Sequence, residues 1–167
     1  PDVVRANLSP AETIDYIAPP MGIQAPLGFE DHLPDRMPVW RRIEEAAKRV
    51  AETYGYREMR TPLLESTELF IRSVGEVTDI VEKEMFTFDK GEKDSLTLRP
   101  ELTASFVRAC VEHGLFKKKA FQKLFYIGAN FRKERPQKGR LRQFHQFGVE
   151  ALGATDPLLD AETVLLA

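Results

Sequence analysis

The chain has 167 residues, of which 43% are hydrophobic and 30% charged, and a net charge of −2, which describes one globular domain with a substantial core. No apolar run approaches the ~20 residues of a membrane-spanning helix and no secretory signal is visible, so we expect no membrane contact and a cytoplasmic location. The single cysteine, Cys110, excludes an internal disulfide and a cysteine metal cluster, and its place on an apolar helical face predicts a buried thiol.

The N-terminal part of the chain predicts an extended arm followed by an amphipathic helix. Residues 1–25 form the arm, because they show no clear periodicity. From about Asp35 to Tyr54 apolar residues recur at helical spacing, and taken alone this helix is expected to face its own core. Tyr56–Thr61 then predicts a strand that Pro62 ends.

The middle and the end of the chain predict short strands and helices. In chain order these are a helix over Ser66–Val74, a loop over Gly75–Glu82, hairpin strands over Glu84–Asp89 and Ser95–Arg99, a helix with Pro100 in its first turn that stops at His113, and a last helix from Asp156 to Leu166. Antiparallel strands interspersed with helices indicate an α+β fold, with an antiparallel β-sheet flanked by helices, and not a parallel doubly wound sheet.

The segment before the last helix predicts a long basic hairpin. Residues 117–142 hold ten Lys and Arg against one acid, Glu134, and such a compact positive zone suits a polyanionic ligand. Side chains alternate between the two faces of a strand. The strand after the loop therefore has one face made of Arg140, Arg142, Phe144, Gln146, Gly148 and Glu150. The other face is largely apolar, and we interpret its His145 as a core histidine.

The strand before the loop agrees with this arrangement. Over Phe121–Glu134 the odd positions predict a core face, and the even positions place Arg132 and Glu134 on the same floor as the residues just named. Arg132 is a candidate phosphate clamp, because a guanidinium fork matches phosphate oxygens and keeps its proton. Phe144 offers a plate for a purine. We expect a common cavity in which a nucleotide and an amino acid lie end to end.

Several separated segments resemble the class II aminoacyl-tRNA synthetases, and the histidyl-tRNA synthetase family in particular. F-R-K-E-R at 131–135 resembles the second motif of the class, and R-P-Q-K-G-R-L-R-Q-F-H-Q-F-G-V-E at 135–150 is similar to the version in that family. Thr97–Ala104 resembles its L-R-P-E-G-T-A segment, and Gly75–Met85 another of its stretches. Leu102 departs from the pattern, since relatives usually carry Gly there.

The resemblance implies roles for individual residues. Arg132 would be the catalytic residue that grips the α-phosphate. The ATP-binding set would be Arg132, Glu134, Arg140 and Phe144. The histidine-binding set would be Glu101, Thr103, Gln146 and Glu150, although an acid at the start of a helix also has a purely structural role with the helix dipole. Contacts to tRNA would come from Gln137, Lys138 and Arg142.

The implied reaction is activation of L-histidine with ATP and Mg²⁺ to histidyl-adenylate, followed by transfer to tRNA(His). The first motif of the class, resembled here by the first helix, strand and Pro62, implies a homodimer. Relatives continue with a third motif and an anticodon-binding domain. We therefore expect residues 26–167 to be the first part of a truncated catalytic domain, which alone is inactive and binds ATP weakly at best.

Two other functions remain open at this point. A regulatory subunit of ATP phosphoribosyltransferase shares the synthetase-like fold without the catalysis, and Leu102 is a modest point in its favour. A basic nucleic-acid-binding module would explain the charge of the hairpin but not Gln146 and Glu150. The R-P-Q-K-G-R loop and Arg132 argue for the synthetase, because a purely regulatory domain need not keep ligands for a triphosphate.

Overall fold

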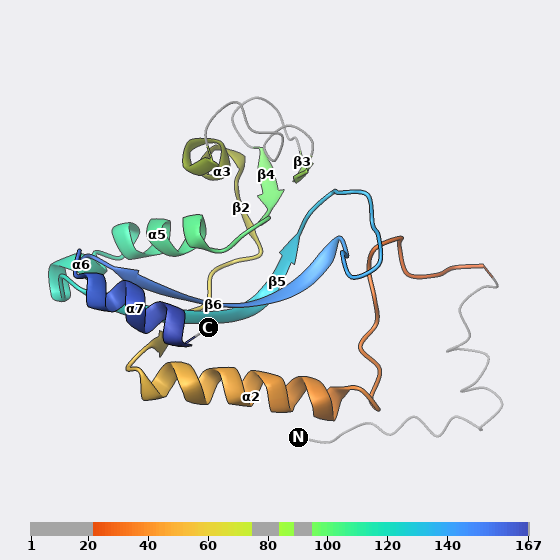
Figure 1. The fold of residues 1–167 in the computed structure, drawn as a ribbon. Coiled ribbons are helices and arrows are strands. Elements are labelled where there is room, and N and C mark those ends of the chain that lie inside the picture. Colours follow the sequence, from red (N-terminus) through yellow and green to blue (C-terminus); the bar gives the residue numbers. More distant parts are fainter. Residues whose placement is uncertain (1–21, 75–83, 89–94, 167) are drawn as a thin grey trace, which may run out of the picture.

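The computed structural model describes residues 22–74, 84–88 and 95–166. Its centre is the hairpin of β5 (Gln122–Phe131) and β6 (Gln143–Leu152), whose ten residue pairs run without a break from Gln122 opposite Leu152 to Phe131 opposite Gln143 (Figure 1). The predicted long hairpin is confirmed. Its unbroken register means that every second side chain of each strand faces the same side over the whole length.

The third strand of this sheet is shorter than predicted, and it is parallel to its neighbour where an antiparallel sheet was expected. β1 (Arg57–Glu58) pairs with β5 in parallel, which gives the strand order β1-β5-β6. The long connection between β1 and β5 permits this parallel pairing, which a tight turn could not join. The predicted α+β class is confirmed, but its main sheet is mixed within the described part of the chain.

Helices cover both faces of the hairpin (Figure 1). On one face α5 (Thr103–Glu112) packs against the even-numbered residues of β5, in a core that contains Phe106, Cys110, Leu124 and Tyr126. This corrects the expectation that only odd positions of β5 form a core. Towards the loop end of the hairpin α5 no longer packs against the even-numbered face, because its contacts are with Leu124 and Tyr126.

The opposite face of the hairpin packs against α2 (Met37–Thr53) and α7 (Pro157–Leu166). Its core joins Ala51, Tyr56, Phe125 and Leu166, with Phe147 and Val149 of β6 packed against it. The predicted helix over 35–54 is confirmed to within two residues. Gly55 follows it with φ of +79°, the left-handed conformation that ends many helices.

A second, small sheet lies beside α3 (Thr67–Val74) and holds the strands in the order β2-β4-β3. β3 (Phe86–Phe88) and β4 (Leu96–Leu98) are the predicted antiparallel hairpin, and β2 (Leu64–Ser66) was not predicted. Another short element, α6 (Leu115–Lys118), was also missed. Both missed elements are too brief to show a periodic pattern, and unlike β3 and β4 they do not flank a turn signal such as Lys90-Gly91.

Two further expectations concern helix starts. Asp156 caps α7, since its carboxylate accepts a hydrogen bond from the Leu158 amide at 3.0 Å. Pro100, in contrast, lies before α5 and not in its first turn, because the helix begins at Thr103. The predicted arm lies mostly, and the predicted loop over 75–82 wholly, outside the described residues. Within the described ranges, no helix combines the length and apolar character needed to cross a bilayer.

Candidate active site on the hairpin

The even-numbered face of β6 contacts the residues that the pattern placed beside it. The ring of Phe144 lies under the guanidinium of Arg132, with 5.1 Å between the guanidinium carbon and the ring centroid. Two residues further, the side-chain oxygen of Gln146 accepts a hydrogen bond from the Asn130 amide at 2.7 Å. Near the other end, the Glu150 carboxylate accepts one from the Thr103 hydroxyl at 2.7 Å. The predicted order of aromatic, amide and carboxylate along one face is therefore present.

Arg132 is held at one side of its guanidinium and left open at the other. Its Nε donates to the Pro100 carbonyl at 3.1 Å, and the flat group lies over Phe144. Its Nη1 is 4.0 Å from the Glu134 carboxylate, the outer limit of an ion pair. The two terminal nitrogens are the part of an Arg that grips a phosphate in fork geometry, so this arrangement suits an anion that arrives above Phe144.

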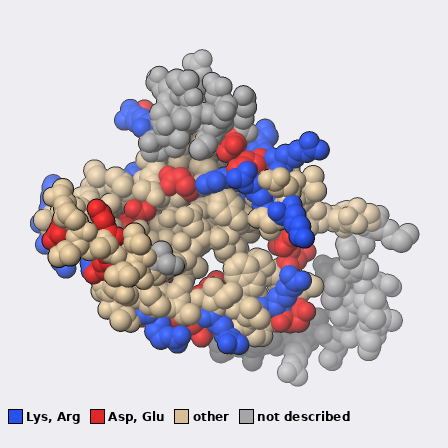
Figure 2. All heavy atoms as spheres, viewed as in Figure 1, with Lys and Arg blue, Asp and Glu red and all other residues tan. Residues whose placement is uncertain are grey.

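Glu134 lies between the two cations assigned to phosphate groups. Its carboxylate is 3.0 Å from Arg140 Nη1, and its side chain is largely buried whereas that of Arg140 is exposed. A phosphate that binds Arg140 must therefore displace or share this ion pair. In Figure 2 basic side chains stand next to acidic ones over the loop end of the hairpin, as this pairing requires.

The loop itself presents the residues expected to contact tRNA in two different ways. Gln137 and Lys138 are exposed, at a turn in which Gly139 has φ of +78°. Arg142 is half-buried, and its Nε donates to the Glu134 carbonyl at 3.1 Å while its Nη1 donates to the Leu27 carbonyl at 3.4 Å. Arg142 thus fastens the loop to the chain before α2, and contact with tRNA stays a prediction for all three residues.

The opposite end of the face is a small polar group around Glu150. Burial raises the pKa of the Glu150 carboxyl, and the nearby Glu101 adds to the rise, whereas the hydrogen bond from Thr103 opposes it. A carboxylate in this position is stabilised by any cation placed beside it. The chemistry of this end therefore favours an ammonium or imidazolium group.

Glu101 has the structural role that was weighed against the functional one. Its carboxylate accepts hydrogen bonds from the Thr103 and Ala104 amides, at 2.5 and 3.0 Å, and so caps α5 one residue before the usual capping position. These amides are among the helix donors that would otherwise lack a partner. Binding of a substrate amine by Glu101 remains a prediction, and it would use the lone pairs that the two amides leave free.

Sequence reasoning missed Tyr126 as part of this group. Tyr126 stands directly opposite Gly148, and a Cβ at Gly148 would lie 2.3 Å from the phenol oxygen. Burial and the Glu150 charge raise the pKa of Tyr126 to about 12, whereas the hydrogen bond with the Thr103 hydroxyl lowers it. Gly148 was identified as part of this face from the sequence, but the ring that lies against it was not, because only the strand register pairs Tyr126 with Gly148.

Leu102 packs into the interior between α5 and the hairpin. It is buried in the same cluster as Phe106 and Tyr126, immediately before the first residue of α5. Leu102 is also the residue before Thr103, whose hydroxyl donates to Glu150, so its packing sets the start of the helix that carries this hydroxyl.

The residues of the site do not share one enclosed cavity. Glu101 and Thr103 line an open hollow of about 830 Å³ between α3 and α5, whose remaining walls are mostly apolar. Glu134, Gln137 and Arg140 line a second hollow of about 600 Å³ at the loop. The expectation of a common cavity is corrected in this respect, and what the two ends share is the half-buried strip of β6 side chains between them.

His145 also differs from its prediction. It lies on the expected face, towards α2, but its side chain is exposed and does not belong to the core. Its ring is 5.0 Å from Trp40 and 5.4 Å from His32, in edge contacts. Partial burial lowers the pKa of His145, and the neighbouring His32 adds to this effect while Glu44 opposes it.

Comparisons with known proteins agree with this fold. A family model described as histidyl-tRNA synthetase matches residues 28–167. The curated histidine–tRNA ligase of Halorhodospira halophila (strain DSM 244 / SL1) is 59% identical over 145 residues, which are 87% of this chain and 34% of that protein. Apo histidyl-tRNA synthetase of S. aureus has a TM-score of 0.69 at 40% identity, over 86% of this chain and 33% of that one.

A further solved structure bears on the alternatives. It is described as an ATP phosphoribosyltransferase regulatory subunit/histidyl-tRNA synthetase from Bacillus halodurans C, with a TM-score of 0.72 at 25% identity over 90% of this chain and 37% of that one. The chain belongs to the histidyl-tRNA synthetase family, as the resemblance of its motifs implied. It spans about a third of the length of the relatives that it matches.

Proposed function

We propose that this chain forms the part of a histidine–tRNA ligase that holds ATP and histidine for the synthesis of histidyl-adenylate. The observation that carries the proposal is the contact of Arg132 with Phe144, on the same hairpin face as the Thr103–Glu150 hydrogen bond. A nucleotide at the first pair and an amino acid at the second would meet above Gln146. The name of the 59% identical relative supports the assignment.

The proposed chemistry needs positioning and charge neutralisation more than covalent help. The carboxylate of histidine attacks the α-phosphorus of ATP, the bond to the β-phosphate oxygen breaks, and pyrophosphate leaves with that electron pair. Arg132 would bind the α-phosphate oxygens and stabilise the charge that develops on them. Arg140 would contact the terminal phosphates, and Phe144 would stack on adenine.

Glu101, Thr103, Gln146 and Glu150 would bind histidine. Thr103 and Gln146 already have partners that fix their direction, namely Glu150 and Asn130. A carboxylate whose pKa is raised by burial gains most from a cationic partner, so Glu150 would be matched to the imidazole side of the substrate. The Gln137 and Lys138 side chains at the exposed turn would reach the acceptor end of tRNA(His), with Arg142 shaping the loop.

Mg²⁺ would come with the nucleotide. Among the described residues no group of three or more His, Cys, Asp or Glu could hold a metal ion. Mg²⁺ usually binds through one or two carboxylates together with phosphate oxygens and water. Glu134, which lies beside Arg132 and Arg140, would complete such a shell, and the ion would neutralise charge on the phosphates.

The proposal includes a homodimer through α2. Val39, Ile43 and Val50 are 60, 60 and 41% exposed and share one face of this helix. The expectation that the apolar side of the helix faces its own core holds only for Ala51 and its neighbours. An exposed apolar stripe beside a buried one supports a second copy as the partner.

A regulatory subunit without catalysis is the second candidate, and the Bacillus halodurans structure at 25% identity keeps it in view. The two functions differ in one step, since only the synthetase makes an adenylate. Histidine-dependent exchange of pyrophosphate into ATP measures that step directly.

The test uses a chimera in which this chain replaces the corresponding third of the Halorhodospira ligase. We expect exchange in the chimera, and a loss of ~10²–10³-fold in rate for Arg132→Ala, as for other deleted transition-state donors. Lys117→Ala is the matched control, because Lys117 is an exposed cation of α6 outside the site. Histidine binding without exchange would favour the regulatory subunit, and equal rates for both variants would contradict the role of Arg132.

A further inference from the structure

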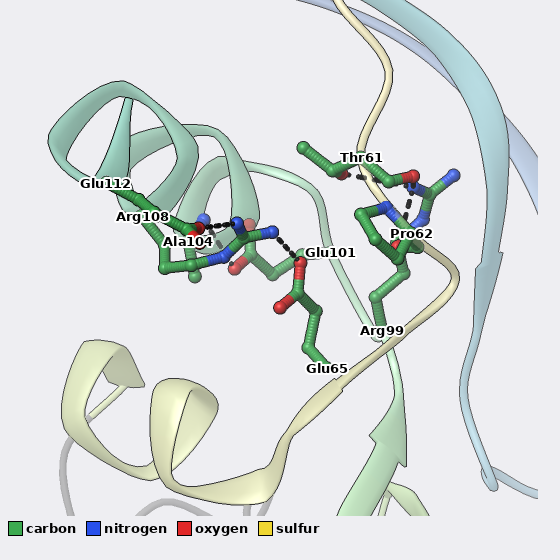
Figure 3. A network of polar contacts seen from close by, with 8 residues as sticks. All are labelled: Thr61, Pro62, Glu65, Arg99, Glu101, Ala104, Arg108 and Glu112. Carbon is green, nitrogen blue, oxygen red and sulfur yellow. Dashed lines mark hydrogen bonds and ion pairs between the residues drawn. The ribbon is translucent and has the colours of Figure 1, made fainter. Parts of the chain in front are cut away.

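Arg99 is a buried cation that the proposed reaction does not use. It is only 4% exposed, and burial lowers its pKa despite the opposing charge of Glu65. Glu65 itself pairs with Arg108 of α5, so Arg99 is compensated mainly by backbone carbonyls (Figure 3). Such a group is expensive to bury unless its donors are satisfied.

The guanidinium of Arg99 connects its own segment to two others. Its Nη1 donates to the carbonyls of Thr61 and Pro62, at 2.8 and 3.2 Å, in the connection that follows β1. Its Nε donates to the Ala129 carbonyl of β5 at 3.0 Å. On the remaining side the guanidinium lies against Gly128, where a Cβ would be 2.6 Å from Nη2. The planar fork of an Arg is needed for this, since a Lys ammonium is a single point.

The backbone of Arg99 leads directly into the site. Its own carbonyl accepts a hydrogen bond from the Phe131 amide at 3.0 Å, and the next carbonyl, that of Pro100, accepts the Nε–H of Arg132 at 3.1 Å. Three residues further along, Thr103 holds Glu150. The segment 99–103 thus spans the phosphate end and the amino-acid end of the site, and Arg99 is the side chain that anchors it.

We propose that Arg99 is a positioning residue, which fixes the Pro100 carbonyl and thereby the orientation of the Arg132 guanidinium. Its effect on ATP rests on the function proposed above, whereas its effect on Arg132 does not. The Pro62 carbonyl accepts a hydrogen bond from Arg99, so a shift of Pro62 would also move Pro100. Arg99 would thus couple the segment after β1 to the orientation of Arg132.

The experiment measures Arg132 itself in the full 167-residue chain. The solvent exchange of the Arg132 Nε–H is followed by ¹⁵N–¹H NMR in the parent, Arg99→Lys and Gly128→Ala. Arg99→Lys keeps the charge and loses the fork. Gly128→Ala keeps the Arg99 side chain, but its added methyl would lie 2.6 Å from Arg99 Nη2 and so displaces the guanidinium. The control is Phe125→Leu, which weakens the core on the opposite face of the hairpin. Thermal unfolding ranks the stability of all three variants.

We expect the Arg132 Nε–H to exchange about tenfold faster in Arg99→Lys and Gly128→Ala than in the parent. In Phe125→Leu, even when it is destabilised to the same extent, the exchange rate should stay at the parent value. Unchanged exchange in Arg99→Lys, or the same acceleration in Phe125→Leu, would overturn the positioning role. Titration with ATP forms the second arm. Weaker ATP binding in Arg99→Lys than in Phe125→Leu supports the role, and equal weakening contradicts it. If the parent chain shows no ATP binding, the exchange arm alone decides the role of Arg99, and pyrophosphate exchange in the chimera decides the proposed function.

Discussion

The guanidinium of Arg132 receives two kinds of support, a hydrogen bond to the Pro100 carbonyl and the face of the Phe144 ring. A cation over an aromatic ring is stabilised by ~0.5–2 kcal/mol, depending on its desolvation. Together these contacts restrict the rotamers of a long side chain before any ligand arrives. An anion that binds the two terminal nitrogens would then lose less conformational entropy than with a free Arg.

Protonation of His145 should change both the stability of the fold and the fluorescence of Trp40, the single tryptophan of the chain, which lies beside it. The pKa of His145 is lowered in the folded state, so between that pKa and the ordinary value of 6.5 the unfolded chain binds more protons. Stability should therefore rise with pH across this window and be lost as the pH falls through it. We expect His145→Gln to make the free energy of unfolding less dependent on pH between 5 and 7.

Urea unfolding at the two pH values, followed by circular dichroism, measures this dependence. The fluorescence of Trp40 should also titrate below pH 6.5 in the parent and lose that step in the variant. His113→Gln is the control, since His113 is an exposed residue at the end of α5. A pH dependence that survives in His145→Gln and disappears in His113→Gln would contradict the assignment.

At the scale of elements, the start of α5 depends on one acid. Glu101 accepts hydrogen bonds from two amides of the first turn, and a negative charge at this end also interacts with the helix dipole. We expect Glu101→Ala to lower the free energy of unfolding by ~0.5–2 kcal/mol, as for the loss of other N-terminal caps. Denaturant unfolding measures the change.

Glu112→Ala is the matched control at the far end of the same helix. Glu112 is exposed and pairs with Arg108 across one turn, an interaction worth ~0.3–0.5 kcal/mol. Equal losses in the two variants, or none for Glu101→Ala, would mean that the cap does not stabilise the helix. A loss confined to Glu101→Ala would show that this residue has a structural role whether or not it also binds a substrate amine.

The hairpin and the residues that share its even-numbered face could be predicted because a period of two persists over ten residues of β6. The burial of both faces of β5 could not be predicted, since Leu124 and Tyr126 become core residues only when α5 folds back over them. The pattern placed His145 on the correct face, but burial depends on how far α2 extends over that face. For the same reason the anchoring role of Arg99, which joins three segments distant in sequence, leaves no local signal.

In the molecule as a whole, part of the apolar surface stays outside the core, and α2 carries three of these exposed side chains on one face. Val39, Ile43 and Val50 remain exposed, although replacement of water by a second copy would remove this surface from solvent. We expect the chain to self-associate, and Ile43→Lys to weaken the association by at least ~10-fold, because a charge buried in an apolar contact must be desolvated. Sedimentation equilibrium measures both.

Val111→Lys is the control for this prediction, since Val111 is an exposed apolar residue of α5 on the other side of the hairpin. It should leave the association unchanged. Association that responds to Val111→Lys and not to Ile43→Lys would place the contact elsewhere. One such place is the outer edge of β6, which pairs only with β5 within the described residues.

We expect Arg132 and Phe144 to bind the nucleotide at the loop end of the hairpin. Titration of ATP into the ¹⁵N-labelled chain, followed by NMR, tests it most directly, because weak binding still gives measurable shifts. We predict saturable shifts at Arg132, Phe144 and Arg140, which Arg132→Ala abolishes and Lys117→Ala preserves. Shifts confined to the basic residues 117–119, or equal shifts in the parent and Arg132→Ala, would mean that Arg132 and Phe144 do not bind the nucleotide.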